Sequence, residues 1–165
     1  MRFIKKSLFV ALITSLFATI SFGTDMTTPK EEAQLLVDEL LPFAEKMLSE
    51  HGEFFPFGAH ITADGKIEFD AASDGSEHPL SNTIIQLLHD AMAQGAKTGK
   101  IRCSGIAYDA RVIPPGSSEK SDAVIIELEH KESYNVKVAF PYKLTGKSAQ
   151  FSQPFAMPGN HLVFP

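Results

Sequence analysis

The chain contains little cysteine, no tryptophan and fewer basic than acidic residues. Cys103 is the single cysteine among 165 residues, so no intramolecular disulfide can form and the fold must be stabilised by its hydrophobic core. A lone cysteine is most often a buried apolar residue. The alternative, a reactive thiol or an intermolecular link, stays open at this point.

Basic residues are too few to suggest a polyanionic partner. Fifteen Lys and Arg against 20 Asp and Glu give a formal net charge of −5. Residues 1–23 hold three of the basic residues and no acidic one, so residues 24–165 carry a charge of −8. Binding to nucleic-acid phosphates or to an anionic membrane surface requires clustered cations. We therefore expect no nucleic-acid partner.

The longest uncharged apolar run lies at the N-terminus. Residues 1–6 include Arg2, Lys5 and Lys6, residues 7–20 are uncharged and largely apolar, and Ser21 and Gly23 are small. This layout is typical of a secretory signal peptide, here residues 1–23. The run is too short to span a bilayer comfortably. We therefore expect a periplasmic or secreted domain over residues 24–165, rather than the alternative of an uncleaved membrane anchor.

Two segments have the periodicity of amphipathic helices. The first begins at Thr28-Pro29-Lys30-Glu31, a capping box with proline at the first helical position, and ends before Gly52. Pro42 lies inside it and predicts a kink or two abutting helices. The second begins at Ser81, the expected N-cap, and ends near Gly95 and Gly99.

Five further segments alternate apolar and polar residues as strands do: 54–62, 67–71, 100–113, 123–130 and 134–142. Asp64-Gly65 predicts a tight turn between the first two. A phase change beside Ser104-Gly105 predicts a β-bulge. From about residue 144 we expect an irregular tail. The order α-β-β-α-β-β-β predicts an α+β two-layer sandwich, with a mainly antiparallel five-stranded sheet and two helices on one face.

This arrangement leaves the second face of the sheet without a helix. Its outward residues would be Glu68, Asp70, Glu127, Glu129 and Lys137. An uncovered sheet face is a natural surface for a protein partner or a second copy of the chain. The leading hypothesis is therefore an exported, non-enzymatic binding or interaction module.

The densest local pattern is His51-Gly52-Glu53-Phe54-Phe55-Pro56-Phe57-Gly58-Ala59. With Asp64-Gly65 and Leu128-Glu129-His130, it resembles a family of small uncharacterised bacterial proteins that share an H-G-E-F-aromatic-P-F-G-A segment. The order of elements is similar to that of profilin-like and roadblock-like folds. These resemblances imply a fold and no activity.

The same segment supplies the candidate ligand-binding residues His51, Glu53, Phe54 and Phe57. Pockets for small molecules are mostly apolar with a few polar groups. The alternative function is therefore a small-ligand binder or weak hydrolase that uses an aromatic pocket near His51. Against it, clustered aromatics usually fill the core.

Other catalytic and metal patterns are weak. Six histidines are present, but none forms the close pair typical of zinc sites. His60 could join Glu127 and Glu129 if its strand lay nearby, yet such acids are more often exposed. No G-x-S-x-G nucleophile elbow occurs. We therefore predict no catalytic residue, no metal site and no cofactor, and the chain is more consistent with a binding protein than with an enzyme.

Overall fold

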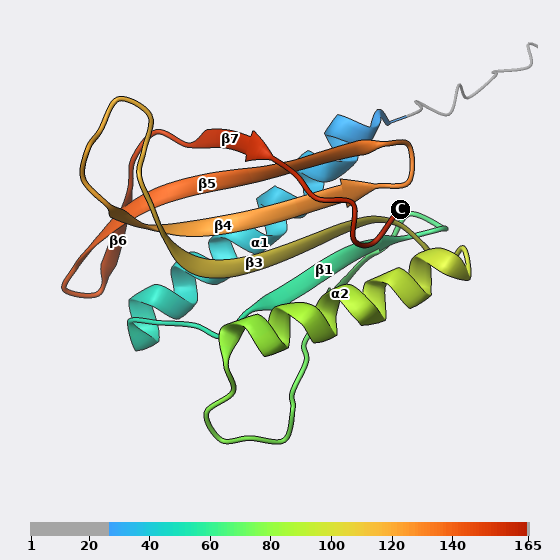
Figure 1. The fold of residues 1–165 in the computed structure, drawn as a ribbon, viewed down its shortest axis with the longest axis horizontal. Helices are drawn as coiled ribbons and strands as arrows, with labels where there is room; N and C mark the ends of the chain where they lie inside the picture. The colour runs from blue at the N-terminus through green and yellow to red at the C-terminus, as the bar shows by residue number, and fades with distance from the viewer. Residues whose placement is uncertain (1–26, 165) are drawn as a thin grey trace, which may run out of the picture.

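The computed structural model describes residues 27–164 as an α+β fold with two helices and seven strands. The helices are α1 (Pro29–His51) and α2 (Ser81–Lys97). The strands are β1 (Phe57–Thr62), β2 (Ile67–Asp70), β3 (Ile101–Val112), β4 (Ser121–His130), β5 (Tyr134–Thr145), β6 (Ser148–Phe151) and β7 (Phe155–Pro158). The predicted order of the first seven elements is confirmed (Figure 1). The predicted signal peptide lies outside the described residues.

The strands form one antiparallel sheet in the order β2-β1-β3-β4-β5-β6, and β7 also pairs with β5. The prediction of five strands is wrong, because part of the expected irregular tail is strand. β5 presents a long free edge to that tail. Its residues 142–145 pair with β6 and its residues 136–139 pair with β7.

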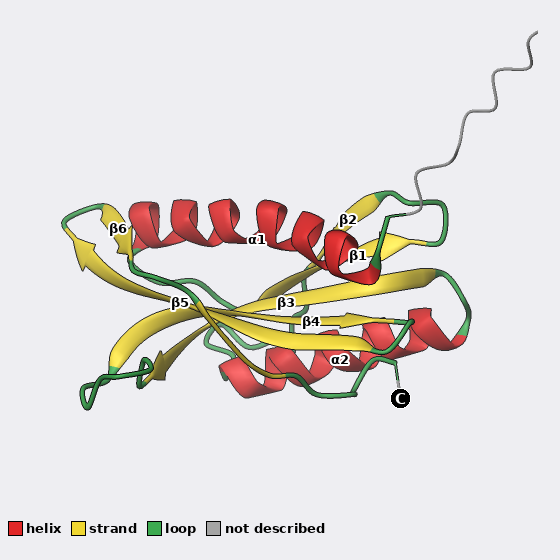
Figure 2. Ribbon diagram, turned by 90° about the horizontal axis from the view of Figure 1, so that it is seen from above, coloured by secondary structure: helices red, strands yellow, loops and turns green. Residues whose placement is uncertain are grey.

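The two helices cover opposite faces of the sheet, so the prediction that both lie on one face is wrong (Figure 2). The reason is visible in β3, whose side chains alternate between the faces. Ala107 belongs to the core under α1, whereas Ile106 faces the other side and is buried in the core under α2. A strand that is apolar on both faces needs cover on both.

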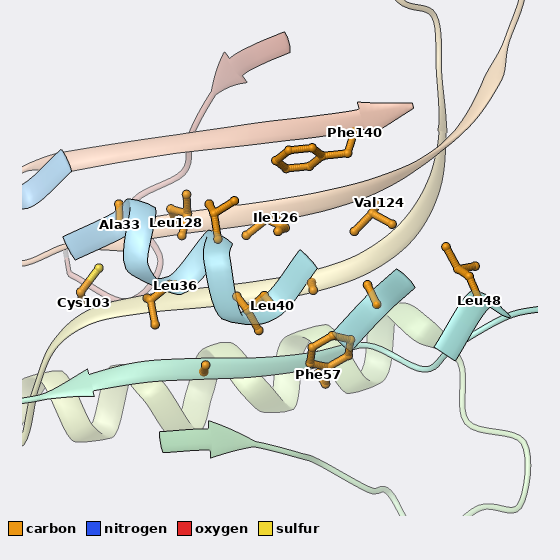
Figure 3. Packing of buried hydrophobic residues seen from close by; sticks show 14 of the residues in the cluster. Ala33, Leu36, Leu40, Leu48, Phe57, Cys103, Val124, Ile126, Leu128 and Phe140 are labelled. Atoms are coloured by element: carbon orange, nitrogen blue, oxygen red, sulfur yellow. The ribbon is translucent and has the colours of Figure 1, made fainter. Parts of the chain in front are cut away.

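The larger core lies between α1 and the sheet (Figure 3). Leu36 and Leu40 of α1 pack against a layer that includes Phe57, Ile126 and Leu128. Gly105 of β3 allows the closest approach, since a Cβ there would lie 2.8 Å from Leu40 Cδ1.

Both predicted ends of α1 are confirmed. The Thr28 side chain accepts from the Glu31 backbone N–H, and the Glu31 side chain accepts from the Thr28 backbone N–H. Gly52 ends the helix at φ 80°, the left-handed region that favours glycine. The helix runs through Pro42 as one element rather than two.

The second core lies under α2. Ile84, Leu88 and Met92 pack with Ile106 of β3 and with Val163 of the C-terminal segment. Ser81 is the first helical residue of α2 and not its cap. Leu80 occupies the N-cap position without a side-chain hydrogen bond.

The β-bulge lies elsewhere than predicted. Ile61 pairs with Cys103 and Thr62 pairs with Ile101, so Arg102 is the extra residue. The ladder between β3 and β4 continues without a shift through Ser104 and Gly105. The bulge places Ile101 in the core under α2 and Cys103 in the core under α1. It also directs Arg102 toward α1, where it contacts Glu32.

Among the described residues, neither helix combines the length and apolarity that crossing a membrane requires.

Candidate functional site

A large apolar concavity lies where the C-terminal end of α1 meets the segment before β1. We call it the aromatic groove. Its cavity volume is about 610 Å³, within the range of roughly 300–1,000 Å³ common for small-molecule sites. Its lining residues are Phe43, Met47, His51, Glu53, Phe54, Phe55, Pro56, Phe57, Ala71, Ala72, Ser81 and Asp109.

The aromatic rings of the groove are held against one another. Phe57 is anchored in the core, and its ring centroid lies 4.8 Å from that of Phe43 and 5.6 Å from that of Phe54. Phe43 also lies 5.7 Å from Phe69 of β2, in a tilted arrangement. Edge-to-face and tilted pairs at these distances are favourable. The rings therefore form a continuous surface. It is contributed by α1, by the segment before β1, by β1 itself and by β2.

Part of this surface is in contact with solvent. Phe55 is 56% exposed and Phe43 is 39% exposed. Neighbouring exposed aromatics of this size mark a binding surface more often than isolated apolar residues do. The aromatic residues of the groove are therefore only partly buried in the core.

Two carboxylates border the aromatic surface. Glu53 is exposed on the segment that leaves α1, and Asp109 is contributed by β3. The Tyr142 hydroxyl donates to Asp109 Oδ1 over 3.1 Å. Loss of hydration raises the pKa of Asp109, with a further increase from Asp122, while the hydrogen bond from Tyr142 acts in the opposite direction. The groove thus combines apolar rings with negative charge.

All four predicted ligand-binding residues, His51, Glu53, Phe54 and Phe57, line this one groove. Their role in binding stays a prediction. His51 is largely exposed and lies 3.8 Å from the Glu50 carboxylate. The sequence interpretation missed Phe43 and Asp109, because only tertiary structure brings α1 and β3 to the segment before β1. Phe55 could have been found, since it lies within the same motif.

The part of the predicted uncovered sheet face that β4 contributes is buried, whereas Glu68 on β2 is exposed as expected. The docking of a partner stays a prediction. Glu127 and Glu129 are only 4% and 2% exposed. Glu129 accepts hydrogen bonds from the backbone N–H groups of three residues near the C-terminus: Leu162, Val163 and Phe164. Lys137 lies 3.1 Å from the Glu127 carboxylate. The cover over Glu127 and Glu129 consists of α2 and the segment after β7 (Figure 2).

His60 does not join these acids. Because β3 lies between β1 and β4, Ser104 separates His60 from Glu129 in the same row of the sheet. The His60 ring instead lies 2.7 Å from Asp70 and 3.7 Å from Glu68, beside a cavity of about 280 Å³ under α2. In the part of the chain that the structure describes, no group of three or more His, Cys, Asp or Glu residues is arranged to hold a metal ion.

No protein-family model, curated protein or solved structure matches the chain. The resemblance to the H-G-E-F-aromatic-P-F-G-A family therefore stays a prediction.

Proposed function

We propose that this protein is a non-enzymatic binding module whose ligand occupies the aromatic groove. The observation that supports it most directly is the convergence of Phe43, Phe54, Phe55 and Phe57 on one open cavity of about 610 Å³. Exposing these rings leaves apolar surface in water at a cost of about 25 cal/mol per Å². A bound apolar group would recover that cost.

The groove replaces the sheet face as the proposed interaction surface. A partner or second copy docking on the face that carries Glu129 would have to displace the C-terminal segment and break the hydrogen bonds of three backbone N–H groups to one carboxylate. The groove requires no such rearrangement. It offers ligand contacts on a surface that is already formed, which reduces the entropic cost of binding.

Binding is favoured over the alternative of a weak hydrolase. Catalysis by His51 would need a positioned partner on the ring and a nucleophile within hydrogen-bond reach. Within residues 27–164, the one acidic group that pairs with His51 is the neighbouring Glu50 at 3.8 Å, and both side chains are half exposed or more. Such a pair does not fix the ring.

We further propose that the domain acts outside the cytoplasm. This rests on the sequence of residues 1–23. Expression of the full chain in a bacterial host should yield a periplasmic product that begins at Thr24, as measured by intact mass and N-terminal sequencing. A product that keeps residues 1–23 and sediments with membranes would support the anchor instead.

The groove is tested with a neutral apolar fluorophore, Nile red, and two matched variants. Phe55→Ala removes an exposed ring from the groove. Ile113→Ala removes an apolar residue of similar exposure, 54% against 56%, that does not line it. Neither change should unfold the protein, because exposed positions contribute little to stability.

We expect saturable binding to the wild-type protein and to Ile113→Ala, and a dissociation constant about fivefold higher or more for Phe55→Ala, since a ring contributes about 1 kcal/mol or more when buried by a ligand. Non-saturable binding, or equal weakening by both variants, would refute the proposal.

A further inference from the structure

The charge of the aromatic groove has one sign. Its lining includes two carboxylates, Glu53 and Asp109, no Lys or Arg, and one histidine, His51, which lies 3.8 Å from the Glu50 carboxylate. The segment between Ala72 and Ser81, which both line the groove, also contains Asp74, Glu77 and His78, all exposed. An apolar ligand in this groove therefore lies in a negative potential.

Neither carboxylate of the lining forms an ion pair with a Lys, Arg or His side chain of the described residues. The charge of Arg111 acts on Asp109 from a longer distance, while Arg111 itself is paired with Asp122 at 3.0 Å. Tyr142 donates to Oδ1 of Asp109 and orients the carboxylate, but a hydroxyl group does not neutralise its charge. A bound cation would compensate this charge, since an opposite charge within about 4–6 Å stabilises a carboxylate.

The rings next to these carboxylates can also interact with a cation. The face of a phenyl ring carries a negative quadrupole, and an ammonium or guanidinium group within about 6 Å of its centroid is attracted to it. Phe43, Phe54 and Phe57 form an edge-to-face cluster, so the planes of their rings are inclined to one another and border the cavity in more than one orientation. Aromatic faces together with carboxylates are the typical surroundings of a bound organic cation.

The acidic character is local and does not simply follow the net charge of the chain. A second concavity, of about 460 Å³ at the C-terminal end of α2, is lined by Lys97, Lys131 and His161 and by no acidic residue. The charged residues that line these two concavities therefore differ in sign. The groove is the one at which negative charge coincides with exposed aromatic rings.

We propose that the ligand of the aromatic groove is an organic cation, an ammonium or guanidinium group carried on an apolar body. This inference rests on the proposed function and specifies its ligand class. The apolar body packs on Phe43 and Phe55, and the cation lies between the ring faces and the carboxylates of Glu53 and Asp109.

The test uses three probes with the same apolar body and different charge: 3-phenylpropylamine, 3-phenylpropanol and 3-phenylpropionate. Their affinities are measured by NMR titration of the full domain from residue 24. We expect the ammonium probe to bind about tenfold more tightly than the alcohol, which corresponds to a modest cation–π and charge contribution, and the carboxylate probe to bind most weakly.

The matched variants are the double substitution Glu53→Gln with Asp109→Asn, and the control Asp90→Asn on the exposed side of α2. Both amides keep the shape of the side chains, and the amide oxygen introduced at position 109 can still accept from Tyr142. The double variant should lose most of the preference for the ammonium probe over the alcohol and keep only the part that the ring faces contribute, about threefold or less, while the control behaves like the wild type. A tenfold preference that persists in the double variant would overturn the inference.

The two proposals fail in different ways. If all three probes bind equally and Phe55→Ala weakens each of them, the groove is an apolar site and the cation inference is wrong. If none of them binds and Nile red does not bind either, the proposed function itself is wrong.

Discussion

Glu32 of α1 and Arg102 of β3 form a bidentate ion pair across the core boundary, with Arg102 Nη2 2.7 Å from Glu32 Oε1 and Arg102 Nε 2.9 Å from Glu32 Oε2. His130 Nε2 lies 3.1 Å from the same Oε2. Because the Glu132 backbone N–H donates to His130 Nδ1, the ring proton lies on Nε2 and is donated to Glu32. This buried carboxylate therefore joins the first turn of α1 to β3 and β4.

Removing the carboxylate should destabilise the protein strongly. Glu32→Ala would leave Arg102 and the buried His130 without their partner, and breaking a buried pair in this way costs about 3–5 kcal/mol. We expect a loss of about 3 kcal/mol in the free energy of unfolding, measured by urea denaturation at pH 7. The exposed variant Glu39→Ala is the control and should change stability by less than about 0.5 kcal/mol. Similar losses for both would contradict the role of the pair.

The same group should contribute to acid unfolding. Burial alone would raise the pKa of Glu32, but hydrogen bonds from Thr27 and His130 and the charge of Arg102 outweigh it, so the pKa lies below 4.5. A lowered pKa stabilises the fold above the unfolded-state pKa, and this contribution is lost as the pH falls through the folded-state pKa. Between about pH 5 and pH 3, wild-type stability should therefore fall more steeply than that of Glu32→Gln. If the free energy of unfolding fell with pH in the same way for both proteins, the protonation of Glu32 would not be coupled to unfolding.

Glu129 should hold the C-terminal segment on the sheet. Its carboxylate accepts three backbone N–H groups at 2.9–3.2 Å, and hydrogen bonds to a charged group contribute about 1.5–3 kcal/mol. Glu129→Gln should therefore increase hydrogen exchange at residues 162–164 by about tenfold or more, as measured by mass spectrometry. Exchange in α1 should be unchanged, and the exposed Glu132→Gln serves as the control. Unchanged exchange at residues 162–164 would show that the carboxylate is dispensable.

Cys103 should be unreactive in the folded protein. Its side chain is fully buried, and burial, together with the negative charge of Glu32, raises the pKa of the thiol to about 12. Because the thiolate is the reactive species, iodoacetamide at about pH 8 should modify Cys103 only after denaturant is added. Labelling of the native protein at the rate of a free cysteine would instead support the reactive-thiol alternative.

Gly105 should be required for the close packing of α1 on β3. A Cβ at this position would lie 2.8 Å from Leu40 Cδ1 and 3.3 Å from Leu128 Cδ2, both buried. Gly105→Ala should therefore destabilise the protein by about 1–3 kcal/mol through overpacking. Combined with Leu40→Ala, it should cost less than the sum of the two single substitutions, because the added methyl group then occupies vacated space. Thermal melts of the three variants measure this, and a neutral Gly105→Ala would contradict the packing argument.

Local signals in the sequence were sufficient for the two helices and the first five strands, but not for β6 and β7. The capping box at Thr28 and the left-handed Gly52 define α1, and the Asp64-Gly65 turn defines the first hairpin. These features depend on residues close together in the chain, so their patterns can be recognised in the sequence without knowledge of the tertiary structure. The motif containing His51 and Phe57 likewise pointed to the segment that borders the groove.

The placement of the second helix was not available from local signals. Ile106 and Ala107 of β3 are buried on opposite faces of the sheet, Ile106 under α2 and Ala107 under α1. Which element covers each face depends on the order of the strands in the sheet, and the alternation within β3 does not specify that order. The burial of Glu127 and Glu129 likewise depends on a segment some 33 residues later in the chain that supplies their hydrogen-bond donors.

The amino-acid sequence by itself determined the two helices, the first five strands and the aromatic motif, because periodicity, capping and turn geometry act over a few residues. Only the tertiary structure decided that α2 covers the face opposite α1, that Arg102 rather than Ser104 forms the bulge, and that Phe43 and Asp109 complete the groove. Those outcomes depend on how both faces of one sheet are buried at the same time, and no single segment of the sequence specifies this.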